Sequence, residues 1–261
     1  MIIYTCITNG YDEIPNNNYY DPDVQYICFT DGTVEKKGPW EFRDIPFDHE
    51  CPLRRALYPK IMQHKIFPIG SEVVWVDGCY VHTKEFVDFS KTAFPRTYMD
   101  HPKKFTYYEE VIESFIASYN SKEDIIKITE ELIKINFDFK KYVNPILASF
   151  WNTVENPTFH EKWWKFAQIS NRCDQIGFIA SKDESWKTVD WTEPGMNFSG
   201  VGGSGRVGRK KKHPTNGDSN QWEMIDEMLL ELKKMTRLHP AFYCKHWRNK
   251  NKLEEWISAH K

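Results

Sequence analysis

The sequence predicts an α/β protein in which helices cover a central sheet, and three observations lead to this class. Short apolar segments rich in β-branched residues alternate along the chain with segments of helical periodicity, beginning with a strand. The run Val73-Val74-Trp75-Val76 is apolar without alternation, which is typical of a strand covered on both faces. A length of 261 residues suits one large α/β domain, with or without a small appendage.

Most of the predicted strands lie in the N-terminal part of the chain. Strands are expected over 2–8, which ends at Asn9-Gly10, over 24–29, and over 40–45, where apolar and polar residues alternate. The segment 12–23, rich in proline and asparagine, is expected to be a loop. Residues 53–66 have helical spacing, and Pro59 predicts that this helix begins near it, because proline is favoured in a first turn. The strand 73–76 then stops at Asp77-Gly78.

The C-terminal part is predicted to be mainly helical. Helices are expected over 106–119 and 122–136, the second capped by Ser121 with Asp124 three residues further on. A strand near 145–151, a helix near 157–169 and a helix opened by 172–175 follow. Residues 192–220 lack hydrophobic periodicity and are expected to be a flexible glycine-rich, basic loop, followed by helices over 222–236 and 252–259. This order predicts one domain over 1–215 and a C-terminal helical extension over 221–261.

Composition excludes several classes of protein. A chain that is 40% hydrophobic and 15% aromatic can bury a core, which excludes global disorder. No apolar run approaches the roughly 20 residues that cross a bilayer, so no membrane partner is expected. A net charge of −2 excludes a globally basic nucleic-acid coat but leaves room for a basic patch. Six scattered cysteines and an N-terminus without a basic leader predict free thiols and a cytoplasmic location.

Acidic or amide residues follow three of the predicted strands, at Asn9, Asp31 and Asp77. Ligands of open α/β sheets bind outside the carboxyl ends of the strands, so these positions are candidates for a site. Asp77 is interpreted either as a ligand of Mg²⁺ or Mn²⁺ that bridges a nucleotide diphosphate, or as a turn aspartate. Asp31 is interpreted as a ribose or base contact, or as a turn residue. Tyr11 either stacks on a base or packs within its turn.

Two basic segments are candidates for phosphate contacts. In the 53–66 helix, Lys60 and His64 lie one turn apart and either face a diphosphate or form a solvated face. Five of the seven residues 206–212 are basic, and this loop either folds over the phosphates of a nucleotide or nucleic acid or stays solvated. His213 ends the run and is either an ordinary histidine or the group that completes a metal shell. No catalytic triad, H-E-x-x-H or Walker motif is present, which argues against a hydrolase or kinase.

Seven short motifs occur in a fixed order over roughly residues 2–213. They are 4–12 (YTCITNGYD), 26–31 (YICFTD), 59–68 (PKIMQHKIFP), 75–78 (WVDG), His101-Pro102 with Tyr108 and Glu110, 163–164 (WW) and 172–175 (RCDQ). In these motifs the chain resembles the glycosyltransferase-like family that includes the plant mucilage-related (MUCI-type) proteins and bacterial and phage members. The resemblance implies a GT-A-like, Rossmann-type sheet that binds a nucleoside-diphosphate sugar, with UDP the expected nucleotide, and Mn²⁺ or Mg²⁺.

The resemblance also implies a role for each matching residue. The residues implied to hold the donor are Thr8, Asn9, Tyr11, Asp31, Arg54, Lys60 and His64. Asp77 stands where the family binds its metal, and His213 would complete the shell. The residues implied on the sugar or acceptor side are His101, Tyr108 and Arg172, and the basic composition of the 206–212 loop adds Arg206, Arg209 and Lys210 as acceptor candidates. Asp174, Gln175 and Glu110 would lie beside the anomeric carbon and act in catalysis.

The expected function is therefore a metal-dependent glycosyltransferase. It would transfer a sugar from a nucleoside diphosphate to an acceptor hydroxyl on a glycan, a protein or a hydroxymethylated DNA base, as in phage DNA modification. Charge stabilisation on the departing diphosphate is the chemistry that a divalent cation and basic side chains supply. The alternative is a non-catalytic module that binds a nucleotide-sugar or a nucleic acid.

Overall fold

The computed structural model describes residues 1–14, 17, 19–78, 80, 82–101, 106–116, 120–143, 145–155, 157–169, 174–194 and 219–238. The chain divides into two compact units. The first comprises Met1–Pro102, Pro145–Lys165 and Ser181–Lys211, and the second comprises Lys103–Asn144, Phe166–Ala180 and Lys212–Lys261. The described residues of the first unit build a sheet with helices, and those of the second are helical. The predicted boundary between 215 and 221 stays a prediction.

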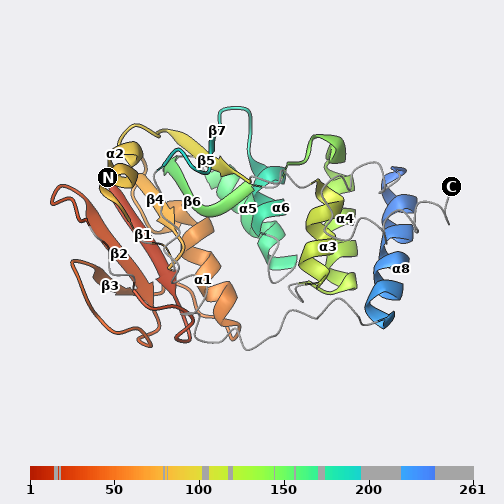
Figure 1. The fold of residues 1–261 in the computed structure, drawn as a ribbon, viewed down its shortest axis with the longest axis horizontal. Coiled ribbons are helices and arrows are strands. Elements are labelled where there is room, and N and C mark those ends of the chain that lie inside the picture. Colours follow the sequence, from red (N-terminus) through yellow and green to blue (C-terminus); the bar gives the residue numbers. More distant parts are fainter. Residues whose placement is uncertain are drawn as a thin grey trace. The chain divides into compact units, whose positions relative to one another are not determined.

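A mixed sheet of seven strands forms the centre of the described part of the first unit (Figure 1). Its order is β3-β2-β1-β4-β6-β5-β7. The strands are β1 (Ile2–Ile7), β2 (Gln25–Thr30), β3 (Glu41–Asp44), β4 (Glu72–Val76), β5 (Arg96–Asp100), β6 (Pro145–Thr153) and β7 (Lys187–Asp190). The pairs among β1 to β4 are parallel, whereas β6 runs antiparallel to β4 and β5. The predicted α/β class with a helix-flanked sheet is confirmed.

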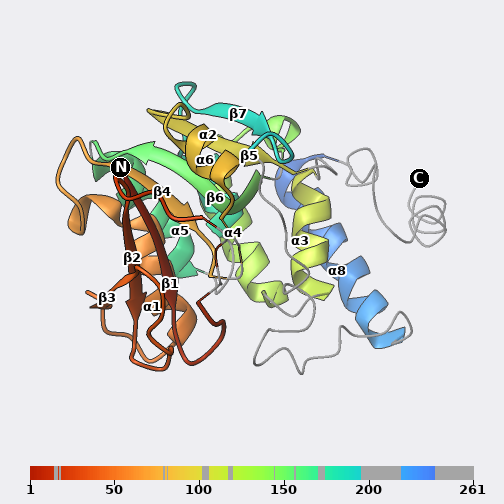
Figure 2. The same cartoon turned by 60° about the vertical axis from the view of Figure 1, so that its left-hand side comes forward.

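Helices cover both faces of this sheet. On one face, Tyr4 of β1 donates to the Pro59 carbonyl of α1 (Pro52–Ile61), and Phe150 of β6 contacts Trp163 of α5 (Pro157–Ile169). On the other face, Trp151 contacts the side chain of Phe86 in α2 (Lys84–Ser90). Figure 2 shows α1 beside β1. Because β4 has helices on both sides, it is buried after Glu72, as its unbroken apolar run predicts.

The predicted start of α1 near Pro59 is wrong. The helix begins at Pro52, and Pro59 lies inside it. Pro52 occupies the first turn, where a proline loses no helical hydrogen bond. The carbonyl of Pro59 accepts from the Tyr4 hydroxyl at 3.1 Å, which holds the proline turn against the sheet. A short 3-10 helix, η1 (Gln63–Lys65), follows.

Four short elements were not predicted from the sequence: α2, β5, β7 and the 3-10 helix η2 (Phe139–Lys141). Thr83 caps α2 by accepting from the Phe86 amide, but this helix has only 7 residues, so it shows little periodicity. The edge strand β7 is largely exposed and lacks an apolar signal. The helix over 157–169 and the other predicted strands agree with the structure to within a few residues.

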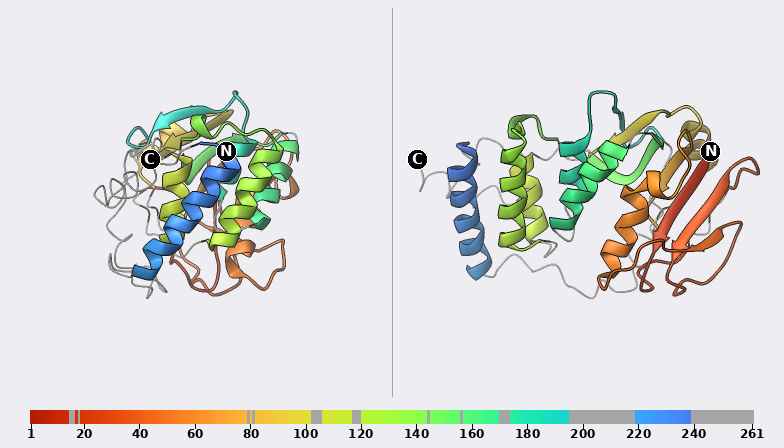
Figure 3. Two further views of the ribbon diagram at one scale, coloured as in Figure 1. Left: turned by 90° about the vertical axis from the view of Figure 1, so that its right-hand side faces the viewer. Right: turned by 180° about the vertical axis from the view of Figure 1, so that it is seen from behind.

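The described part of the second unit is built from helices around its own core. They are α3 (Tyr107–Ile116), α4 (Lys122–Lys134), η2 (Phe139–Lys141), most of α6 (Asp174–Ser181) and α8 (Ser219–Thr236). The predicted capping box of Ser121 and Asp124 is present at the start of α4. Figure 3 shows α4 beside α8, which is drawn in blue. Buried side chains of α3, α4 and α8, such as Tyr107, Ile128 and Leu229, meet in this core.

Three further findings bear on the sequence predictions. Cys6, Cys28 and Cys51 are free thiols, and the other cysteines lie outside the described residues. None of the described helices is long and apolar enough to cross a membrane. Most of the predicted loop over 192–220 and the predicted helix over 252–259 fall outside the described residues.

Candidate functional site

The carboxyl ends of β2, β1 and β4 meet at one edge of the sheet. These three strands are adjacent and parallel, with Ile7 opposite Thr30 and Tyr4 opposite Trp75. The polar residues that follow the strands therefore come from neighbouring strand ends, as the sequence predicts. The loops also touch, because a Cβ on Gly78 would lie 2.8 Å from Ile7 Cγ1 and 3.3 Å from Asp12 Cβ.

Asp31 organises the turn that follows β1. Its Oδ2 accepts from the Asn9 amide at 2.8 Å, and its Oδ1 accepts from the Thr33 hydroxyl at 2.6 Å. The hydroxyl of Thr33 in turn accepts from the Gly10 amide at 2.8 Å. Asn9 has a φ of 55°, a left-handed backbone that asparagine tolerates. The structure thus gives Asp31 the turn role, and its ribose contact stays a prediction.

The charge of Asp31 is stabilised in place. Partial burial raises the pKa of its carboxyl, but hydrogen bonds from Thr33 and Asn9 and the nearby Arg55 outweigh that effect and leave the pKa below its ordinary value. Arg55 Nη2 lies 3.4 Å from Asp31 Oδ2. The buried Nε of Arg55 has no hydrogen-bond partner among the described residues. The Arg55 side chain as a whole is 26% exposed, so part of the guanidinium lies at this edge of the sheet while its Nε is buried.

Arg55 is a site residue that the sequence analysis missed in favour of Arg54. Which of the two arginines faces the strand ends depends on the residue at which α1 begins. Because α1 begins at Pro52, Arg55 lies in its first turns and reaches Asp31. Arg54 is half-buried on the same helix, and its predicted role stays a prediction.

Lys60 and Asp77 form the second charged group of this edge. Lys60 Nζ lies 3.7 Å from Asp77 Oδ1 and 5.4 Å from the centre of the Trp75 ring. The indole Nε1 of Trp75 donates to Asp77 Oδ1 at 2.8 Å. The Lys60 side chain is 7% exposed and that of Asp77 is 39% exposed. The interpretation of Lys60 as part of a solvated face is therefore wrong, and Asp77 lies at the rim as expected.

Asp77 is compatible with a divalent ion, although it does not build a site by itself. Mg²⁺ commonly takes one or two protein carboxylates together with substrate phosphates and water. Among the described residues, no group of three or more His, Cys, Asp or Glu side chains could hold a metal. The metal role of Asp77 therefore stays a prediction.

Three other predicted donor residues have local partners. The buried Thr8 hydroxyl donates to the Pro52 carbonyl at 3.1 Å, which joins the end of β1 to the start of α1. The backbone amide of Tyr11 donates to the Thr8 carbonyl, and the Tyr11 side chain is half-buried. The ring of His64 stacks on His160, with centroids 5.2 Å apart. Burial, aided by the charge of Lys65, lowers the pKa of His64.

Four predicted catalytic or acceptor residues belong to the second unit. Tyr108 is buried in the helical core, and its hydroxyl hydrogen bonds with Thr236 at 2.6 Å. Glu110 of α3 is 9% exposed. Asp174 and Gln175 begin α6 and are half-buried. His101, which follows β5 in the first unit, is also half-buried.

The remaining predicted site residues lie outside the described residues. They are Arg172, Arg206, Arg209, Lys210 and His213. Their roles toward an acceptor or a metal stay predictions.

Comparison with known proteins gives no match: no family model and no curated protein matches the chain. The functional argument therefore depends on the strand-end residues themselves and on the motif resemblance.

Proposed function

We propose that the protein is a glycosyltransferase that binds a nucleoside-diphosphate sugar at the carboxyl edge of β2, β1 and β4. The observation that carries the proposal is the pairing of two cationic side chains with two strand-end aspartates, Arg55 with Asp31 and Lys60 with Asp77. Guanidinium and ammonium groups each carry several donors, so each of these side chains can keep its aspartate and also donate to a diphosphate, which has many acceptor oxygens.

The strand-end residues support three parts of donor binding. The ordered turn at Asn9 supplies a fixed surface beside β1, because Asp31 holds its amide. The partly exposed guanidinium of Arg55 and the ammonium of Lys60 supply hydrogen-bond donors and positive charge for the phosphates. Asp77 at the rim would hold a divalent ion, with UDP the expected nucleotide.

The proposed reaction moves one glycosyl group. The acceptor oxygen forms a bond to the anomeric carbon, and the bond from that carbon to the diphosphate oxygen breaks with its electron pair on the diphosphate. The products are the glycosylated acceptor, the nucleoside diphosphate and one proton. Cationic side chains favour this step because negative charge develops on the leaving diphosphate. The roles implied for Asp174, Gln175 and Glu110 in this step stay predictions.

A second candidate function is non-catalytic nucleotide or nucleic-acid binding. The position of Lys60 favours it, because this ammonium group already lies beside Asp77, where it can provide the positive charge that a diphosphate needs. Such a module would bind the nucleotide without breaking the sugar bond.

Calorimetry with UDP and UDP-sugars, followed by an assay for released UDP, separates these candidates. We expect UDP to bind the wild-type protein, and Lys60→Gln to weaken binding about tenfold or more through loss of a charge-assisted contact. Lys65→Gln is the matched control, because Lys65 is exposed and lies in the next helical segment. Binding with UDP release supports the transferase, and binding without release of UDP from any sugar donor supports the module. Failure of UDP, GDP and their sugars to bind would contradict the transferase and the nucleotide-binding form of the module.

A further inference from the structure

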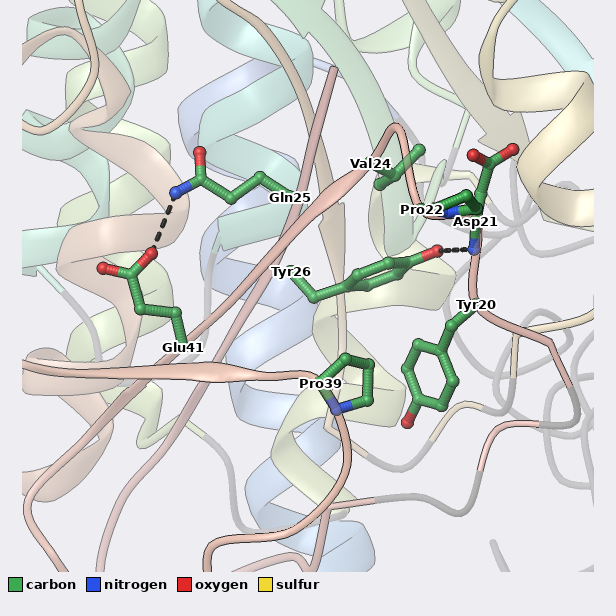
Figure 4. Close-up of a pocket in the computed structure, with 8 residues that line it drawn as sticks. All are labelled: Tyr20, Asp21, Pro22, Val24, Gln25, Tyr26, Pro39 and Glu41. Carbon is green, nitrogen blue, oxygen red and sulfur yellow. Dashed lines mark hydrogen bonds between the residues drawn. The ribbon is translucent and has the colours of Figure 1, made fainter.

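A cavity of about 300 Å³ lies in the first unit at the other ends of β2 and β3 (Figure 4). Gln25 and Glu41, the first residues of β2 and β3, form part of its lining. Asp31 follows β2 at its opposite end, about 20 Å along the strand at about 3.3 Å per residue. The cavity is therefore a different place from the strand-end residues, and the donor proposal does not use it.

Tyrosine and proline side chains provide the apolar part of the cavity. Figure 4 shows the ring of Tyr26 with Tyr20 and Pro39 beside it and Pro22 near its hydroxyl end. The rings of Tyr20 and Tyr26 meet edge to face, with centroids 5.1 Å apart. Hydrogen bonds hold both rings, because the Tyr26 hydroxyl accepts from the Asp21 amide and the Tyr20 hydroxyl accepts from Trp40 Nε1. Ligand binding at this surface would cost little side-chain ordering.

An amide and a carboxylate form the polar part. Gln25 Nε2 donates to Glu41 Oε2 at 2.8 Å, the contact drawn in Figure 4, and Arg43 Nε donates to Glu41 Oε1 at 2.7 Å. The second acid of the lining, Asp21, accepts from Lys91 Nζ at 2.6 Å. Because each carboxylate has a cationic neighbour, the cavity does not favour a cationic ligand. Gln25 and Glu41 together still offer hydrogen-bond donors and acceptors.

We propose that this cavity binds a neutral sugar ring. Tyr26 itself is buried, but a pyranose has a C–H face that can pack on the half-buried ring of Tyr20 and on the exposed Pro22 and Pro39. Its hydroxyl groups both donate and accept, which matches Glu41 and Gln25. The volume is at the lower end of the range for small-molecule sites, so it suits one ring rather than a long segment of polymer. The chain would then hold a saccharide at a place remote from the sheet edge that the donor proposal uses.

Ligand-observed saturation-transfer NMR tests this proposal without any nucleotide present. The probes are the methyl glycosides of β-glucose, β-galactose and α-mannose, and a hexaproline peptide tests the competing occupant of a tyrosine and proline surface. We expect at least one glycoside to receive saturation at its ring C–H protons. Its affinity should fall about tenfold in Glu41→Ala and in Tyr20→Ala. Glu35→Ala is the matched control, because Glu35 is an exposed acid of the same unit.

The outcomes separate this site from the donor site. Saturation transfer that persists in excess UDP but weakens in Glu41→Ala supports sugar binding in the cavity. This conclusion does not depend on the transferase proposal. Glu41 is exposed, so its replacement tests binding even where Tyr20→Ala fails to fold. The proposal is overturned if no glycoside binds, if both cavity variants bind as the wild type does, or if only hexaproline binds.

Discussion

Lys60 and Asp77 connect α1 to the end of β4 through an ion pair whose two members differ in exposure. The Lys60 ammonium lies 3.7 Å from Asp77 Oδ1, and the lysine side chain is 7% exposed whereas the aspartate is 39% exposed. A buried charge that loses its partner is costly, but a charge at the rim can turn to water. The two halves of the pair are therefore unequal in what they contribute to stability.

This inequality predicts that Asp77→Ala is more destabilising than Lys60→Met. We expect Asp77→Ala to lower the free energy of unfolding by about 1–3 kcal/mol, because it leaves a buried ammonium without this carboxylate. Lys60→Met keeps the aliphatic packing and should cost less. Urea denaturation measures both changes. Asp77→Asn is the control, since its side chain can still accept from Trp75. A larger loss in Lys60→Met would contradict the argument.

Asp31 gives a second prediction, on the turn after β1. Asp31→Ala removes the acceptor for Asn9 and Thr33, and we expect it to lower the free energy of unfolding by about 2–3 kcal/mol. Thr33→Val removes one hydroxyl and should cost about 1 kcal/mol. The pKa of Asp31 is depressed, so its contribution is present at neutral pH and is lost as the pH falls below about 4. Equal stability of Asp31→Ala and Asp44→Ala, an exposed acid at the end of β3, would contradict this role.

Buried histidines predict a loss of stability in mild acid. Burial lowers the pKa of His82 to about 3, and burial also lowers that of His160 to about 4 against an opposing hydrogen bond to the Ile61 carbonyl. Unfolded histidine has a pKa of about 6.5, so the unfolded state binds more protons between these values and stability falls as the pH drops.

Urea denaturation between pH 7.5 and pH 4.5 measures this dependence. Each buried histidine should add about 1.4 kcal/mol per pH unit below about pH 6.5. His160→Gln should reduce the slope even where it also lowers stability at neutral pH. A stability that stays constant between pH 6.5 and pH 5 would contradict the neutral buried state of both rings.

These residues also show which features of the candidate site could be predicted from the sequence. The meeting of Asp31 and Asp77 with the Asn9 turn at one sheet edge was predictable, because apolar runs locate the strands and parallel strands share their carboxyl edge. The selection of Arg55 over Arg54 was not, because it depends on the first residue of α1. The sequence analysis placed that start near Pro59, whereas the helix begins at Pro52 and includes Pro59.

Tertiary context also explains the elements that sequence patterns missed. β5 has only 5 residues and pairs with β6 and β7 on its two sides, so its stability comes from strands distant in the sequence. The burial of Lys60 could not be predicted from the sequence either, because a lysine in a helical pattern usually indicates a solvated position. The buried position comes from Trp75 and Asp77, which only the folded chain places beside it.

Metal dependence is the fourth prediction, and it rests on the proposed function. We expect Mn²⁺ to raise the affinity for UDP by about tenfold or more, because one carboxylate with phosphate oxygens is a usual shell for such ions. Asp77→Asn should bind UDP but lose the enhancement. Calorimetry with EDTA and then with Mn²⁺ measures both affinities. An unchanged enhancement in Asp77→Asn would remove Asp77 as the metal ligand.

The fifth prediction separates catalysis from nucleotide binding in the second unit. If Asp174 and Glu110 hold the catalytic roles that the motif resemblance implies, Asp174→Asn and Glu110→Gln should lower the rate of sugar transfer by about 100-fold or more. Affinity for UDP should stay within about twofold of the wild type, since neither residue is assigned to the diphosphate.

Asp174 begins α6, so its replacement can also cost up to about 1 kcal/mol of stability through the helix dipole. Thermal unfolding therefore accompanies each rate, and Glu113→Gln on α3 is the matched control. Full activity in both folded variants would show that these carboxylates do not act in catalysis. UDP binding would then remain the test of the strand-end site.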